Sequence, residues 1–200
     1  MFEQISRLIL ALQDAGALQD KEVINALTAF APCIEDLDYR SQFFGELGVR
    51  LATLGQCEQA EEIVRLVDNS EKSEFLRHVA DLESKRNERD RAYRLLLEAR
   101  EAVASHRLPT QQAQALAEIA TSFGELAREE EALETWNLAV ELAKKAQHRG
   151  GTDGPEAAGV LVKAVDAFCK AGEFDLARST AEGLVFPEVR ERALRAIDDA

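Results

Sequence analysis

The sequence predicts an all-α protein, built as a solenoid of helix-turn-helix repeats, and three observations carry this prediction. Apolar residues recur at i, i+3, i+4 and i+7 through nearly all of the 200 residues, which is the spacing of amphipathic helices, and alternation with a period of two is almost absent. Only 4 Pro and 11 Gly interrupt the chain, while Ala, Leu, Glu and Arg, which favour helices, dominate it. The third observation is a motif that recurs along the chain.

This motif is a hexad of the pattern apolar–apolar–x–x–apolar–small, which begins at Phe43, Phe75, Ala115 and Val160 and returns loosely at Ala193. A turn residue follows about two helical turns after each of the first four hexads, and an alanine stands five residues beyond each turn. The turn residues are Gly55, Asn87, Ala127 and Gly172, and the alanines are Ala60, Ala92, Ala132 and Ala177. Because the small residue lets two helices approach closely, these constant offsets predict four helix hairpins joined by linkers of variable length.

The helices predicted from these patterns follow in order along the chain. They are 2–14 and 21–31, then the pairs 38–54 with 57–67, 71–86 with 88–105, 111–127 with 129–147 and 156–171 with 174–184, and a last helix over 187–199. Asp20, Ser70 and Thr110 are suitable N-caps, since a short side-chain oxygen can accept a free N–H of the first turn. Pro155 and Pro187 suit the first helical position, where a missing N–H costs nothing.

We expect a single domain over residues 1–200. Residues 1–37 form a degenerate N-terminal hairpin, 38–185 the four hairpins, and 186–200 a C-terminal capping helix. Terminal units of a solenoid are expected to be atypical, because one of their faces meets water instead of a neighbour. The stretch 148–156 (HRGGTDGPE) reads as an exposed inserted loop, since the pattern is the same on both sides of it.

The stretches LATLGQCEQA (51–60) and AFCKAGEFDLA (167–177), each continued by a second amphipathic helix, resemble the tetratricopeptide repeat (TPR). The small residues of the first helices at Gly48, Ala80 and Ala120 match the family pattern, as do the alanines of the second helices. The resemblance covers about residues 38–199. Other positions depart from the family pattern, and the early tryptophan of the first helix is missing. The late aromatic of the first helix appears only as Phe123 and Phe168, while the other units have Leu51 and Glu83 there. In the fourth unit, Val165 replaces the small residue. HEAT-like or other paired-helix repeats are the alternatives.

The resemblance implies that the first helices line a concave surface, which would bind an extended peptide or a partner helix. The residues expected to project there are Gln42, Val49, Thr53, Glu74, Arg77, Asp81, Ser84, Lys85, Gln114, Thr121, Glu125, Asp166 and Lys170. This lining is polar and of mixed charge. A clamp for terminal carboxylates is not predicted, because few of these residues are basic and Asp81 would oppose an anion.

The charge of the chain disfavours several classes of protein. With 37 Asp and Glu against 24 Lys and Arg, the formal net charge is −13 at pH 7, which disfavours nucleic acids and anionic membranes and favours partners with basic segments. No apolar run approaches the roughly 20 residues of a membrane span. The N-terminus lacks the features of a signal peptide. The three cysteines, Cys33, Cys57 and Cys169, show no metal or disulfide spacing, so we expect buried thiols in the reducing cytoplasm.

Motifs for catalysis are absent from the sequence, which has no HExxH, GxSxG or phosphate-binding loop. No catalytic, cofactor-binding or metal-ligating residue is therefore predicted. RNA contact is one interpretation of the basic stretch 85–94, but Glu88 and Asp90 interrupt this stretch. Pairing of Arg94 with Glu98 and Glu101 favours a salt-bridged helix face instead. Trp136 and Phe123 fall at core positions.

We therefore expect a non-catalytic scaffold for protein–protein interaction. The first alternative is a self-associating module that stacks through Val189, Ala193, Leu194 and Ile197 of the last helix. A nucleic-acid-binding helical regulator or an enzyme is less favoured.

Overall fold

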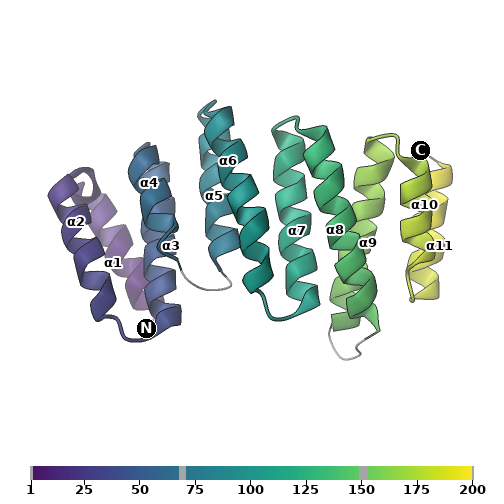
Figure 1. Ribbon diagram of the computed structural model, residues 1–200, viewed down its shortest axis with the longest axis horizontal. Coiled ribbons are helices and arrows are strands. Elements are labelled where there is room, and N and C mark those ends of the chain that lie inside the picture. Colours follow the sequence, from purple (N-terminus) through teal and green to yellow (C-terminus); the bar gives the residue numbers. More distant parts are fainter. Residues whose placement is uncertain (1, 68–70, 149–152, 200) are drawn as a thin grey trace. The chain divides into compact units, whose positions relative to one another are not determined.

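The computed structural model describes residues 2–67, 71–148 and 153–199, with side chains from residue 7 onward. These residues form eleven α-helices and three short 3-10 helices, and no strand occurs among them (Figure 1). The prediction of an all-α protein is therefore confirmed. The chain divides into two compact units, Met1–Ser105 and His106–Ala200, which we call unit 1 and unit 2 and describe separately.

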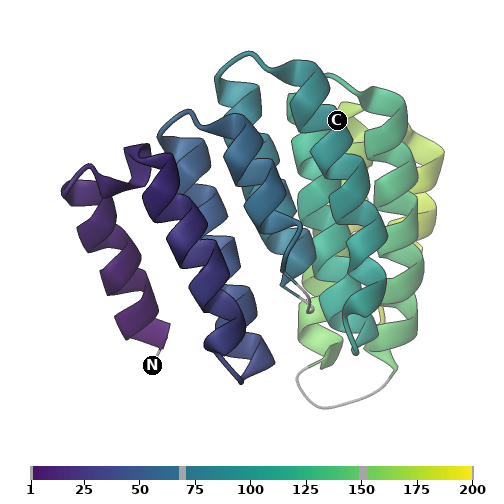
Figure 2. The same ribbon diagram turned by 60° about the vertical axis from the view of Figure 1, so that its left-hand side comes forward.

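Unit 1 contains six α-helices, which Figure 2 shows from the side of the N-terminus. They are α1 (Phe2–Asp14), α2 (Lys21–Phe30), α3 (Leu37–Thr53), α4 (Cys57–Val64), α5 (Lys72–Lys85) and α6 (Arg89–Ala102). Helix α3 packs against α4 and α5 against α6, and each of these pairs is consecutive in the chain. The first helices also contact one another, α1 with α3 and α3 with α5.

Unit 2 repeats this arrangement with five α-helices. They are α7 (Pro109–Glu125), α8 (Glu129–Gln147), α9 (Asp153–Lys170), α10 (Phe174–Glu182) and α11 (Pro187–Asp198). Helix α7 packs against α8 and α9 against α10, while α9 also contacts both α7 and α11. Helix α9 therefore lies between α7 and α11, and this position makes it the centre of the site described below.

The helix ends agree with the predicted ends to within about one turn, and the caps differ in detail. The side chain of Asp20 accepts the N–H of Glu22 at 2.8 Å, and Pro187 begins α11, both as predicted. The N-cap predicted at Thr110 is wrong, because Pro109 already begins α7 and Thr110 lies buried in the first turn. Pro155 is the third residue of α9 rather than the first, and Ser70 lies outside the described residues.

The four turn residues of the hairpins share one backbone conformation. The φ angles of Gly55, Asn87, Ala127 and Gly172 are 84°, 67°, 53° and 78°. In each turn, the N–H of this residue donates to the carbonyl three residues earlier and the next N–H donates to the carbonyl five residues earlier, at 2.9–3.0 Å. This is the Schellman motif, which ends a helix with a left-handed residue. The predicted turns are confirmed, including the two that are not glycine.

The carbonyls that accept the longer of these bonds belong to one equivalent position in each first helix. The residues at this position are Leu51, Glu83, Phe123 and Phe168. All four side chains are completely buried, at 0% exposure. Three of them are large and apolar, so the carboxylate of Glu83 is the exception at a core position.

Small residues allow close helix contacts in unit 1. The side chain of Val64 in α4 fills the space that a β-carbon on Gly48 would need, and the ring of Phe75 in α5 does the same for Gly45. The alanines of the second helices are buried as well (Ala60, Ala92, Ala132 and Ala177). These observations confirm the predicted role of small residues, and Trp136 and Phe123 are buried in the core as expected.

The cysteines correct one expectation, because their thiols are not buried in the core. Cys33 is exposed at the end of a short 3-10 helix, and Cys57 and Cys169 are half-buried. Helix ends and groove walls, where these residues lie, leave part of the side chain open to solvent.

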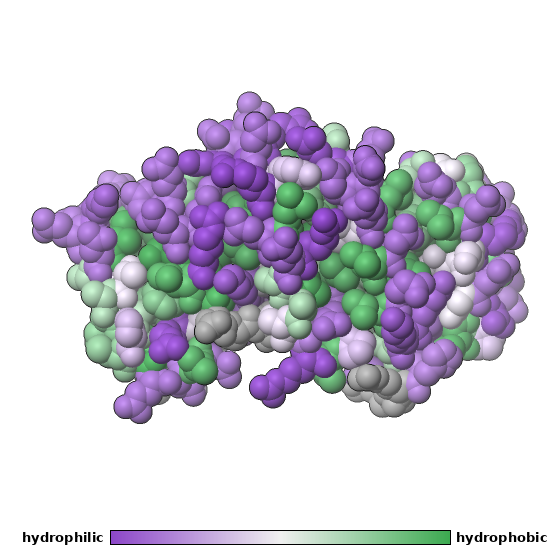
Figure 3. Space-filling view, in the orientation of Figure 1, coloured by the Kyte–Doolittle hydropathy of each residue, from purple (hydrophilic) through white to green (hydrophobic). Residues whose placement is uncertain are grey.

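Hydrophilic and hydrophobic residues are interspersed over the face that Figure 3 shows. None of the described helices is long and apolar enough to span a membrane.

Candidate functional site

The structure places eight of the predicted concave-face residues in unit 1, and none of them is buried. They lie on α3 and α5, and several have partners on their own helix. Arg77 pairs with Asp81 at 2.9 Å, and the hydroxyl of Thr53 donates to the carbonyl of Val49 at 2.8 Å. These local contacts place polar side chains at the surface but do not by themselves form a binding site.

In unit 2, four of the five predicted residues come together in one groove. Thr121 and Glu125 of α7 face Asp166 and Lys170 of α9 across a space of about 700 Å³. We call this space the α7–α9 groove. Its remaining lining is largely apolar and comes from α7, α8 and α9, including Ala120, Ala132, Leu133, Trp136 and Ala167. Gln114, the fifth predicted residue, lies on α7 outside this lining.

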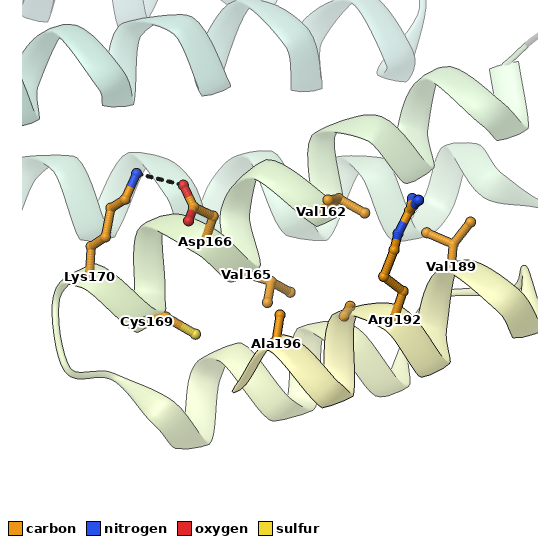
Figure 4. Close-up of a pocket in the computed structure, with 9 residues that line it drawn as sticks. Val162, Val165, Asp166, Cys169, Lys170, Val189, Arg192 and Ala196 are labelled. Carbon is orange, nitrogen blue, oxygen red and sulfur yellow. Dashed lines mark hydrogen bonds and ion pairs between the residues drawn. The ribbon is translucent and has the colours of Figure 1, made fainter. Parts of the chain in front are cut away.

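A second groove runs along the other side of α9, between α9 and α11. It consists of two adjoining pockets of about 470 Å³ and 510 Å³, which share Val162, Val189 and Arg192. We call it the α9–α11 groove. Figure 4 shows Val165 of α9 opposite Ala196 of α11, with Cys169 at one end and Arg192 extending from α11.

The sequence of α9 explains why this groove exists. One face of the helix, which includes Leu161, Ala164 and Phe168, is buried completely in unit 2. A second apolar stripe, with Val162 and Val165 at its centre, lines the groove. Helices that are apolar on more than one face usually pack against neighbours on more than one side. Ala158 and Gly159 on α9 and Ala193 and Ala196 on α11 are too small to fill the space between the two helices.

The grooves differ in charge. The α7–α9 groove carries Glu125 and Glu129 on its wall opposite α9. The α9–α11 groove alone carries Arg192. Lys163 and the exposed pair of Lys170 with Asp166, whose atoms Nζ and Oδ2 are 2.7 Å apart, line both grooves. Sequence reasoning missed Val162, Lys163 and Arg192, and it assigned Val189 only to a surface for self-association. The signal that could have found them is the apolar character of α9 on both of its faces.

The basic stretch of unit 1 forms ion pairs between helices. Arg91 lies 3.2 Å from Glu58 and 3.4 Å from Glu61 of α4. Arg65 pairs with Glu98 at 2.8 Å, and the hydrogen bond from Glu98 raises the pKa of the Arg65 guanidinium. The predicted pairing of Glu98 with Arg94 is therefore wrong, because Arg65 takes both oxygens of that carboxylate.

Both grooves of unit 2 offer apolar surface bordered by charges, which supports non-covalent binding of a chain segment. Among the described residues, no group of three His, Cys, Asp or Glu side chains could hold a metal ion.

The fold and these grooves define an all-helical protein of packed hairpins with open surfaces along the first helices. No protein-family model and no curated protein matches the chain. Solved structures resemble it, and two of them serve as examples. One is Ton1535 from Thermococcus onnurineus NA1, with a TM-score of 0.52 and 15% identity over 98% of this chain, which spans 57% of the length of Ton1535.

The other is BtubC (BKLC) from P. vanneervenii, with a TM-score of 0.54 and 17% identity over 99% of this chain and 81% of the other. At these identities the likeness concerns the fold alone.

Proposed function

We propose that the protein is a non-catalytic scaffold, a TPR-like solenoid that binds a peptide or a partner protein through the face formed by its first helices. The observation that supports this most strongly is in unit 2. There, α7, α9 and α11 border two grooves, and four of the residues predicted for the binding face line one of them. The equivalent left-handed turns in four hairpins support the repeat itself.

The grooves have the size and chemistry of sites for chain segments. Volumes of about 470–700 Å³ fall within the range of about 300–1,000 Å³ that is typical of ligand-binding clefts. Apolar walls supply the free energy of binding, and charges at the rim fix the orientation of the ligand. Recognition of a helix or an extended peptide in such a groove uses a few apolar anchors spaced along one side of the ligand.

Affinity capture with three versions of the protein tests this function. Replacing Val162 and Val189 with glutamine makes the α9–α11 groove polar without adding charge. Replacing Leu138, which is 50% exposed on α8, with glutamine is the matched control. Captured proteins should be recovered with the wild type and the control and lost with the groove variant, as measured by quantitative mass spectrometry. An identical set of proteins on all three would exclude the α9–α11 groove as the binding surface and leave only the α7–α9 groove.

Self-association through α11 is the second candidate function, and one observation limits it. Val189 and Leu194 are half-buried, but Ala193 and Ile197 are each only 6% exposed, because they already pack inside unit 2. The apolar surface left for a second copy is correspondingly small. Analytical ultracentrifugation tests this candidate, which fails if the protein stays monomeric at high concentration.

A further inference from the structure

The α9–α11 groove has a definite length and direction. Its lining on α9 runs from Pro155 to Lys170, and its lining on α11 runs from Val189 to Ala196. With a rise of about 1.5 Å per residue, these stretches are about 22 Å and about 10 Å long. The N-terminal half of α9 lines one pocket and its C-terminal half lines the other, while Val189 and Arg192 of α11 line both and Ala193 and Ala196 line only the second. The groove therefore runs along the helix axes.

The spacing of the lining residues suits a third helix. On α9 the stripe passes through Ala158, Val162, Val165 and Cys169, at steps of three and four residues. The side chains of a helix of three to four turns form ridges at the same steps, and such ridges pack into the groove between two neighbouring helices. An extended segment lacks this match, because its side chains alternate between opposite sides.

The charges of the groove favour one type of ligand. Within the part of the chain that the structure describes, neither Lys163 nor Arg192 takes part in an ion pair or a side-chain hydrogen bond. The only carboxylate in the lining belongs to Asp166, which is paired with Lys170. Glu191 lies on α11 but pairs with Arg195 outside the lining. The groove thus presents two exposed cations without a neutralising partner beside its valines.

These local charges point to a different ligand from the one that the net charge of −13 favours. Charges that are more than about 8 Å apart are largely screened at physiological ionic strength. A segment inside the groove therefore responds mainly to Arg192 and to Lys163, which also lines the α7–α9 groove together with Glu125 and Glu129. The many carboxylates elsewhere on the chain affect the approach of a partner more than the bound state.

We propose that the α9–α11 groove binds an acidic amphipathic helix of a partner protein, and this proposal rests on the proposed function. The apolar side chains of this helix would contact the half-buried Val162 and Val189, and its carboxylates would pair with Lys163 and Arg192.

A peptide-display selection tests this proposal. The bait is the wild-type protein at physiological ionic strength, and the library consists of random peptides of about 16 residues, enough for about four helical turns. Enriched peptides are synthesised, and their affinities are measured by fluorescence anisotropy against the wild type and three double variants. The charge variant is K163E/R192E, the groove variant is V162Q/V189Q, and the matched control is K145E/R195E, which makes the same change of charge at exposed positions outside the groove.

The proposal expects enriched peptides that combine apolar residues at helical spacing with Glu and Asp. Their affinity should fall about tenfold or more in the charge variant, because two attractive pairs become repulsive, and should be unchanged in the control. Replacing the glutamates of a peptide with lysine should restore its binding to the charge variant. Circular dichroism confirms that every variant is folded.

Other results overturn the proposal in distinguishable ways. Enriched peptides that are basic, or that bind the charge variant normally, refute the acidic ligand. If V162Q/V189Q still abolishes their binding, the proposed function survives. If neither variant affects binding, or if no peptide is enriched, both the acidic ligand and the role of this groove in the proposed function are refuted. Dimerisation of the wild type that V162Q/V189Q abolishes would show that the groove binds a second copy instead.

Discussion

The side chain of Val64 occupies the space that a β-carbon on Gly48 would need, so the backbones of α3 and α4 approach more closely than two larger residues would allow. The carbonyl oxygen of Ala60 lies on the same side, 3.3 Å from that β-carbon position. The contact shows in atomic detail why the hexad ends in a small residue: the facing helix occupies the space.

Replacing Gly48 with alanine should destabilise the protein by about 1–2 kcal/mol, because overpacking against a stiff valine outweighs the gain of about 1 kcal/mol in helix propensity. Gly159 on α9 is the control, since nothing lies within 4 Å of its β-carbon position. Its replacement with alanine should stabilise the protein by up to about 1 kcal/mol. Urea denaturation of both variants measures the difference, and a stabilised G48A protein would contradict the close contact.

The left-handed turns predict a pair of opposite effects in unit 2. Ala127 has a φ of 53°, and an L-residue in this region carries about 1 kcal/mol of strain that glycine avoids. Changing Ala127 to Gly should therefore stabilise the protein by about 0.5–1 kcal/mol. Changing Gly172 to Ala should destabilise it by a similar amount, through the backbone alone, because its β-carbon position is open. Thermal unfolding should move in opposite directions, and shifts of the same sign would refute the equivalence of the two turns.

Replacing Glu83 with leucine should stabilise the protein by about 1–2 kcal/mol. Neither oxygen of this buried carboxylate makes a hydrogen bond of ordinary geometry within the described residues, and a buried charge is often less stable than an apolar side chain of similar size. Leu51 shows that leucine fits the equivalent position in the preceding hairpin. E83Q is the control, because it keeps the shape and a polar end. A loss of stability in E83L, measured by urea denaturation, would contradict this prediction.

Cys57 should react more slowly with a disulfide reagent than the exposed Cys33. Burial raises the pKa of the Cys57 thiol, and the neighbouring carboxylate of Glu83 raises it further. Because only the thiolate reacts, a raised pKa slows the reaction at neutral pH. Single-cysteine variants measured with DTNB check the order, and E83Q should accelerate the reaction of Cys57. Equal rates at Cys57 with and without the carboxylate would contradict this account.

The same shift has a consequence for stability at alkaline pH. As the pH rises, the unfolded chain loses its thiol proton first, because the pKa of the folded state is higher. The stabilisation is therefore complete below the ordinary thiol pKa of about 8.5 and is lost as the pH passes through the folded-state value. Wild-type protein should lose more stability between pH 8 and pH 10 than a Cys57→Ala variant, as measured by urea denaturation.

Much of the fold followed from local patterns. The turns at Asn87 and Ala127 were predicted from constant offsets although neither residue is glycine, because the packing of hexad and alanine on both sides determines where the chain must reverse. Thr110 was assigned wrongly because a threonine oxygen and a preceding proline both suit a helix start, and local sequence does not decide between them.

The site was predicted only in part. Thr121, Glu125, Asp166 and Lys170 line the α7–α9 groove as expected of residues on the exposed side of first helices. The α9–α11 groove was missed, since Val162 stands at a hexad position to which the pattern assigns no role and Val189 was assigned to self-association. Whether an apolar residue is covered depends on the size of the residues opposite it, here the alanines of α11, and this pairing is set by tertiary structure.

The four Schellman turns also bear on how the chain folds during synthesis. Each turn joins two helices that follow one another directly, so closing a hairpin costs little chain entropy and needs no contact with distant sequence. A hairpin can therefore form as soon as its second helix has left the ribosome. Apolar faces such as that of α9 then stay uncovered until the next hairpin emerges, and the order of synthesis becomes the order of burial.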